Sequence, residues 1–236
     1  MMIIDGQVFQ GDNLVIINGT VVNAGIGGEK KRFDEKRKVD AKGVDRLIID
    51  TTFIDVNIVP IASSEVEVHL SGEASVDGKL ELQAELIGRS YNINVKVKGN
   101  VYNGRLRLDI QLPNKAFEII EVQTESANIN LNTGVYSKKI WLKTKTGDIR
   151  MQARFKEADS STMSGDIRVD ISAKEDIMLN TKTMSGDIAI SLDNIARPNV
   201  STRTMSGDTR NYYQSKPKGY TAQIKASSMS GDIDIR

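Results

Sequence analysis

A short motif recurs from residue 146 to the C-terminus of this chain. It is the tetrapeptide Ser-Gly-Asp-Ile, usually preceded by Met, and complete copies stand at 163–167, 184–188 and 229–233. A copy at 205–209 ends in Thr, and a copy without Met begins at Thr146. The motif glycines lie 18 to 24 residues apart. A fixed turn motif at a period of about 20 residues indicates an array in which each repeat adds one supersecondary unit.

The repeated turn predicts a parallel β-solenoid of coils of about 20 residues, in which equivalent residues stack at the inter-strand spacing of about 4.8 Å. The competing arrangement is an antiparallel meander in which each Ser-Gly-Asp is a hairpin turn. Identical turns favour the solenoid, because only stacking in register gives every copy of a residue the same neighbours and so the same structural role. The chain shows no convincing amphipathic helix, so the predicted fold class is all-β.

Each motif position then has an expected structural role. Glycine supplies a positive φ or a close backbone approach, and Asp accepts backbone N–H groups. These predicted turn residues are Gly147, Asp148, Gly165, Asp166, Gly186, Asp187, Gly207, Asp208, Gly231 and Asp232. The predicted core residues are Ile129, Ile149, Ile167, Ile188 and Ile233, whereas Thr209 weakens its coil. Hydroxyl residues three positions before each glycine, and just before it, are expected to hydrogen-bond along the stack.

The methionine of the motif is harder to assign to folding. In the two earlier copies its position holds Glu125 and Lys145, and such residues are almost never fully buried without a partner. The position is therefore expected to face solvent, and its methionines are predicted to form an apolar row that binds a partner. The alternative is that a loop or an edge of the same chain covers the row. The row consists of Met163, Met184, Met205 and Met229.

The rest of the chain divides at about residue 43. Residues 44–112 alternate between apolar and polar side chains, which is typical of strands with one buried face. Residues 1–43 hold a predicted hairpin with an Asn18-Gly19 turn and then a charged run over 29–42. The run is expected to be a solvated connector, and the alternative is a basic patch for a nucleic acid or a phospholipid. We therefore expect an N-terminal segment over 1–43 and a solenoid domain over 44–236, with the repeats in 113–236. Residues 50–56 are interpreted as a cryptic unit of the same kind in the first half of the chain.

Composition bounds the function. The formal net charge of +1 argues against a nucleic acid as an electrostatic partner of the whole chain. The absence of cysteine excludes disulfides and thiolate metal sites. The N-terminus lacks the pattern of a signal peptide, and no stretch is apolar enough to span a bilayer, so the default expectation is a cytoplasmic protein.

Enzymatic and metal chemistry have weak support in the sequence. Calcium-binding rolls need several oxygen ligands about every nine residues, whereas this motif supplies one Asp in about 20. A carbohydrate-active enzyme on a β-helix would need a distinct pair of carboxylates, but these aspartates recur once per coil. Arg150, Arg168 and Arg210, two residues after motif aspartates, are expected to neutralise them. His69 stands in an alternating strand without a triad-like spacing. We therefore expect no cofactor and no catalytic residue, with the enzyme and a cation-stabilised module as alternatives.

The Leu-Pro-Asn-Lys segment at 112–115, followed by Thr-x-Ser-Gly-Asp-Ile units, resembles the bacterial putative-adhesin family of unknown function. The resemblance covers roughly residues 44–236. It implies a right-handed β-helix or β-solenoid and a link to the bacterial cell envelope. With the repeat, it predicts a non-enzymatic binding or scaffolding module for a protein or glycan partner, with self-association through the solenoid ends.

Overall fold

The structure is a computed structural model that describes residues 2–4, 7–9, 14–17, 20–23, 29–132, 134–213 and 218–236. Apart from one 3-10 turn, η1 (Ala41–Gly43), its regular elements are strands, as predicted. The strands before the repeats are β1 (Met2–Ile4), β2 (Gln7–Phe9), β3 (Leu14–Ile17), β4 (Thr20–Asn23), β5 (Glu29–Asp40), β6 (Arg46–Asp50), β7 (Asp55–Ile61), β8 (Glu65–Ile87) and β9 (Ser90–Pro113). The strands that follow are β10 (Ala116–Gln123), β11 (Ile129–Leu131), β12 (Tyr136–Lys143), β13 (Ile149–Met151), β14 (Arg154–Ser161), β15 (Ile167–Ser172), β16 (Ile177–Lys182), β17 (Ile188–Asp193), β18 (Ile195–Arg203), β19 (Thr209–Asn211), β20 (Tyr220–Ser227) and β21 (Ile233–Ile235).

The predicted N-terminal hairpin is confirmed. Strands β3 and β4 pair antiparallel, and Ile17 opposite Thr20 leaves a two-residue connection. The Asn18-Gly19 turn itself lies outside the described residues. Strands β1 and β2 form a second antiparallel pair.

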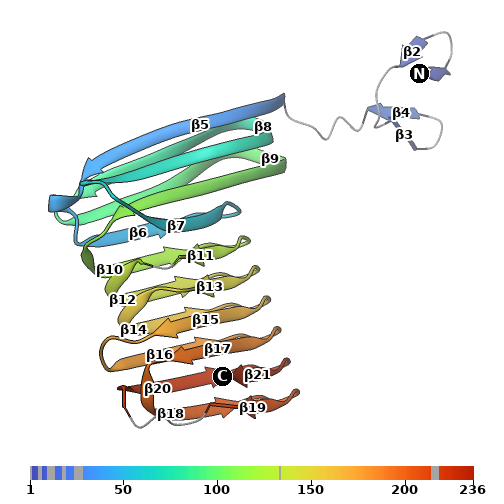
Figure 1. The fold of residues 1–236 in the computed structure, drawn as a ribbon. Coiled ribbons are helices and arrows are strands. Elements are labelled where there is room, and N and C mark those ends of the chain that lie inside the picture. Colours follow the sequence, from blue (N-terminus) through green and yellow to red (C-terminus); the bar gives the residue numbers. More distant parts are fainter. Residues whose placement is uncertain are drawn as a thin grey trace.

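The charged run is a strand, so its prediction as a connector is wrong. Strand β5 pairs antiparallel with β8 along its whole length and forms an edge of the large sheet (Figure 1). Opposite charges face each other across this pair, as in Lys38–Glu67 at 2.9 Å, while Phe33 and Val39 pack against the core. A charged edge strand also protects a sheet from pairing with other chains. The large sheet therefore also includes β5, which precedes residue 44.

Strands β8 and β9 link the antiparallel end to the solenoid. They form a long hairpin, and β9 then runs parallel to β6 with its first residues and parallel to β7 with its last ones. Strands β6 and β7 thus form the first coil, which confirms the cryptic unit. Its Asp55 carboxylate accepts the backbone N–H of Asn128 in the next coil at 2.9 Å.

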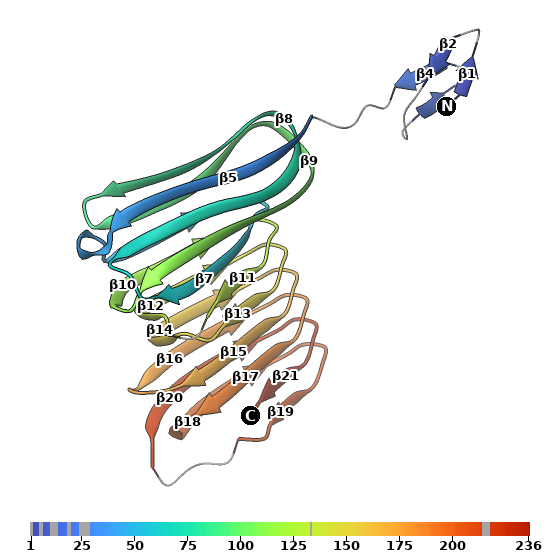
Figure 2. The same ribbon diagram turned by 45° about the horizontal axis from the view of Figure 1, so that its top comes forward.

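Each later coil consists of one strand, a corner that holds the motif, and a second strand. The first strands stack in one parallel layer and the second strands in another (Figure 2), and one core of buried apolar side chains spans all the coils. The motif isoleucines stack in register, for example Ile149 beside Ile167 and Ile167 beside Ile188. The fold is therefore a parallel β-solenoid, and the antiparallel meander is excluded for the repeats.

The last two coils do not stack in chain order. Strands β20 and β21, at the C-terminus, lie between the β16–β17 coil and the β18–β19 coil (Figure 1). Polarity explains the order, because the inward positions of the inserted coil are apolar and buried: Ala222, Ile224, Ala226, Ile233 and Ile235. The outermost coil carries Thr209 and Asn211, both exposed, at the matching positions. Pro198 in its edge strand lacks a backbone N–H and suits such an edge.

Candidate binding ridge at the solenoid corners

The corner glycines allow the coils to approach closely. The five glycines of the motif have φ between +140° and +148°, a region that L side chains rarely adopt. A Cβ atom on Gly186 would lie 2.1 Å from the carbonyl oxygen of Gly165 in the neighbouring coil, and the other four would meet a similar clash. Both roles predicted for glycine, the positive φ and the close approach, are confirmed.

The motif aspartates form a continuous hydrogen-bonded ladder. The backbone N–H of each Asp donates to Oδ1 of the Asp or Asn in the neighbouring coil at 2.8–2.9 Å. From the first coil outward the ladder runs through Asp55, Asn128, Asp148, Asp166, Asp187, Asp232 and Asp208. The predicted role of Asp as an acceptor of backbone N–H groups is confirmed, and the donors come from neighbouring coils.

Hydroxyls and isoleucines complete the corner. The Thr or Ser three residues before the glycine donates from its hydroxyl to the glycine-position carbonyl of the neighbouring coil, as in Thr183 to Gly165 at 3.1 Å. Thr144, Thr162, Thr204 and Ser228 repeat this bond at 3.1–3.2 Å. The five predicted motif isoleucines are at most 1 % exposed. These positions are therefore explained by folding.

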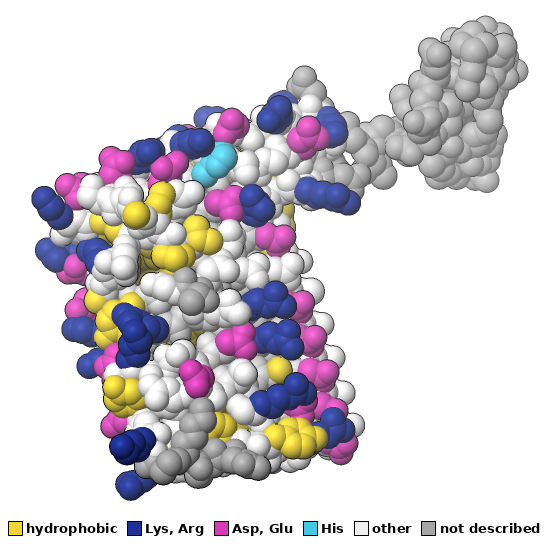
Figure 3. Space-filling view, in the orientation of Figure 1, with side chains coloured by type: hydrophobic (Ala, Val, Ile, Leu, Met, Phe, Trp, Pro, Cys, Tyr) yellow, Lys and Arg dark blue, Asp and Glu magenta, His cyan; other side chains and the backbone are white. Residues whose placement is uncertain are grey.

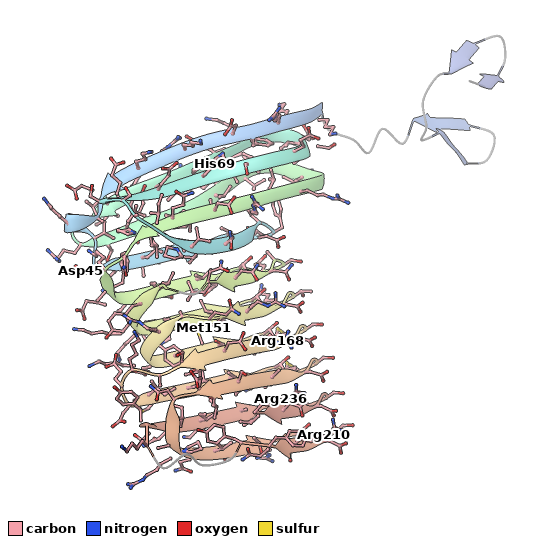
Figure 4. All side chains as sticks on the ribbon, in the orientation of Figure 1. Asp45, His69, Met151, Arg168, Arg210 and Arg236 are labelled. Atoms are coloured by element: carbon pink, nitrogen blue, oxygen red, sulfur yellow. The ribbon has the colours of Figure 1, made fainter. Side chains whose placement is uncertain are left out.

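The methionine position is different because its side chains face solvent. Met163, Met184, Met229 and Met205, in their order along the stack, are 52, 41, 45 and 73 % exposed. Nothing in the described part of the chain covers them, so the loop-covered alternative fails. With the serine after each methionine they line a shallow apolar groove. The four side chains are called the methionine ridge below. By contrast, Met151 on β13 is buried in the core (Figure 4).

A cationic row runs beside the ridge. Each member ends the first strand of its coil and stands two residues before the ridge position: Lys143, Lys182 and Arg203. All three are exposed, and none has a carboxylate within 4 Å among the described residues. At the inner end of the ridge, Lys145 pairs instead with Glu125 of the preceding coil. The row was not predicted, because in chain order Lys182 and Arg203 belong to consecutive coils, and only the stacking order places a cation at every second coil.

The other side of the corner carries carboxylates and arginines. A hollow over the second strands is lined by four motif aspartates, all except Asp208, together with Arg150, Arg168 and Arg210. Figure 3 shows acidic and basic side chains mixed along this edge. Figure 4 places Arg168 and Arg210 on β15 and β19. Arg210 pairs with Asp208 at 3.0 Å and lies 3.7 Å from Asp232. The predicted neutralisation is thus found at Arg210, whereas Arg150 and Arg168 have no carboxylate within 4 Å in the described residues.

Catalytic and metal chemistry find little support in these side chains. The described residues contain no cluster of three or more His, Cys, Asp or Glu that could hold a metal ion. His69 on β8 lies far from the corners (Figure 4), and its Nε2 is 2.6 Å from Oδ1 of Asp34 on β5. This hydrogen bond lowers the pKa of Asp34. The pair could not be predicted from the sequence, because the charged run that carries Asp34 lacks the alternation of a strand.

Two solved structures are similar to this chain, and the first of them supports the fold. A putative cell adhesion protein from Clostridium sporogenes is 16 % identical, with a TM-score of 0.53, and the match covers 87 % of this chain and 99 % of that one. A putative adhesin from Bacteroides fragilis is 11 % identical, with a TM-score of 0.47, over 86 % of this chain and 97 % of that one. A comparison with curated proteins found no match. In the described residues no helix is long and apolar enough to cross a membrane.

A family model places the chain more firmly. The model described as Toastrack DUF4097 matches residues 44–236, which is most of the chain. The matched region begins just after η1 and omits β5, although β5 belongs to the same sheet. The chain therefore belongs to the Toastrack DUF4097 family.

Proposed function

We propose that this chain is a non-enzymatic, adhesin-like binding module associated with the bacterial cell envelope, and that the methionine ridge is its binding surface. The observation that carries the proposal is the exposure of four in-register methionines within a motif whose glycine, aspartate and isoleucine serve the fold. Folding does not require an apolar side chain at this position, because Glu125 and Lys145 occupy it in two earlier coils. A contiguous exposed apolar row typically marks an interaction site.

The chemistry of the ridge suits a protein partner better than a glycan. Sugar rings commonly stack on aromatic side chains, and the ridge and its groove contain none. Methionine is flexible and polarizable, and adaptable protein-binding surfaces are rich in it. Association with the cell envelope is supported by the adhesin names of the structurally similar proteins.

The carboxylates support a non-enzymatic role. Glycosidases use two carboxyl groups in different environments, one of which holds a proton. Here, apart from the outermost Asp208, each motif aspartate uses Oδ1 to accept a backbone N–H of the next coil, and the corners share one arrangement. A structural ladder of this kind offers no distinct acid and base.

The proposal is tested by affinity capture from the native host with three forms of the protein. The double variant Met184→Glu/Met205→Glu places charges on the ridge, and Met178→Glu is the matched control because Met178 is 50 % exposed on β16, away from the ridge. We expect specific partners to be captured by the wild type and the control and lost by the ridge variant. An identical partner set for all three forms would overturn the proposal.

A further inference from the structure

We propose that the partner of the methionine ridge is an amphipathic α-helix with acidic residues beside its apolar stripe, lying along the solenoid axis. This inference rests on the proposed function and names the chemistry of the partner. Three observations carry it: the spacing of the ridge, the unpaired cationic row beside it, and the small size of the apolar strip.

The spacing of the ridge matches the turns of a helix. Parallel pairing in register sets neighbouring ridge methionines about 4.8 Å apart, so four of them extend over about 14 Å. A helix presents one apolar side chain per turn of about 5.4 Å, or about 16 Å over three turns. An extended strand presents same-face residues about 6.7 Å apart, or about 20 Å over three intervals. Flexible methionines absorb a mismatch of about 2 Å more readily than one of about 6 Å.

The cationic row selects the charge of that helix. Lys143, Lys182 and Arg203 belong to every second coil, so they lie about 9.6 Å apart. Two helical turns advance about 10.8 Å, so acidic residues recurring every seven positions would each meet one cation. On the other side of the ridge stand the neutral hydroxyls of the motif serines. An acidic flank on the side of the cations is therefore complementary to this surface.

The size of the strip argues against a second copy of the chain as the occupant. It is about 14 Å long and one side chain wide, whereas a stable dimer commonly buries about 800 Å² on each partner. A narrow strip of this kind suits the apolar stripe of a single helix laid in a groove.

Synthetic peptides of about 20 residues test the proposal by fluorescence anisotropy with the full-length protein. The first peptide is an amphipathic helix with leucines at i, i+3, i+4 and i+7 and glutamates beside them. The second carries lysines in place of the glutamates. The third has the composition of the first, rearranged to alternate as a strand. We expect the acidic helix to bind about tenfold more tightly than the basic helix, as three exposed ion pairs allow, and more tightly than the alternating peptide.

Variants assign the contacts. Lys182→Glu/Arg203→Glu should reverse the preference between acidic and basic helices, Met184→Glu/Met205→Glu should abolish binding of both, and Met178→Glu should change neither. Equal binding of the two helices, an unreversed preference, or tighter binding of the alternating peptide would overturn the helix proposal. None of these results contradicts the proposed function if the ridge variant still loses its native partners in the affinity capture. Retention of those partners would refute the proposed function itself.

Discussion

The order of the last two coils makes a prediction about two single substitutions. Ile233 is fully buried in the inserted C-terminal coil, whereas Thr209 occupies the equivalent position of the outermost coil and is exposed. Ile233→Thr removes a methylene group, at a cost of about 0.5–1.5 kcal/mol. It also buries a hydroxyl in an apolar site, which costs about 1–3 kcal/mol. We therefore expect the free energy of unfolding to fall by about 1.5–4.5 kcal/mol.

The reverse substitution, Thr209→Ile, should change stability by less than about 0.5 kcal/mol because it alters an exposed side chain. Ile167→Thr, in a central coil, is the matched control and should cost as much as Ile233→Thr, since Ile167 is equally buried. Urea unfolding followed by circular dichroism and by the fluorescence of Trp141, the only tryptophan, measures all three. Stacking in chain order would give the opposite pattern, with a small loss for Ile233→Thr and a clear gain for Thr209→Ile. That pattern would refute the insertion.

Three further predictions concern the corners and the inserted coil. Gly186→Ala should lower the free energy of urea unfolding by more than about 3 kcal/mol, because residue 186 has a positive φ and its Cβ would lie 2.1 Å from a carbonyl oxygen. An unchanged urea midpoint would contradict the close approach of the coils. Asp187→Ala should lower the free energy of unfolding by about 1–3 kcal/mol, because it leaves the backbone N–H of Asp232 without its acceptor. Asp208→Ala, at the end of the ladder, should lower it less, and equal losses for the two variants would contradict the ladder. The hydrogen bond from the backbone N–H of Thr221 lowers the pKa of the Asp176 carboxyl. The ionised carboxylate therefore stabilises the folded state above the unfolded pKa of about 3.9, and this stabilisation is lost as pH falls through the lower folded pKa. The difference in melting temperature between the wild type and Asp176→Asn should therefore close below about pH 4, and a difference that grows in acid would contradict this assignment.

Much of the corner could be predicted from the sequence because a repeated residue in a solenoid has a repeated environment. Gly186 and Asp187 have the same neighbours as their counterparts in adjacent coils, so one role explains every copy. The exposure of the ridge was also predictable, since charged Glu125 and Lys145 occupy its position in earlier coils. These inferences needed no knowledge of the order in which the coils stack.

The order itself could not be predicted, because the last two coils carry nearly the same motif and each can stack on either neighbour. Thr209 indicated a weak coil, but whether that coil lay inside or at the end depended on its competition with the more apolar coil that follows it. The sequence also did not predict that β5 is a strand. As an edge strand it packs only Phe33 and Val39 against the core, so its sequence lacks a clear apolar alternation.

The central claim is that the motif methionines bind a partner, whereas the motif glycine, aspartate and isoleucine serve the fold. Its most direct test is oxidative footprinting of the methionines with and without the native partner. Mass spectrometry of hydrogen peroxide-treated protein reports the oxidation rate of each thioether. Partner binding should slow oxidation of Met163, Met184, Met205 and Met229 and leave exposed Met178 unchanged, while buried Met151 stays slow throughout. Unchanged rates along the ridge, or protection at Met178 instead, would contradict the account.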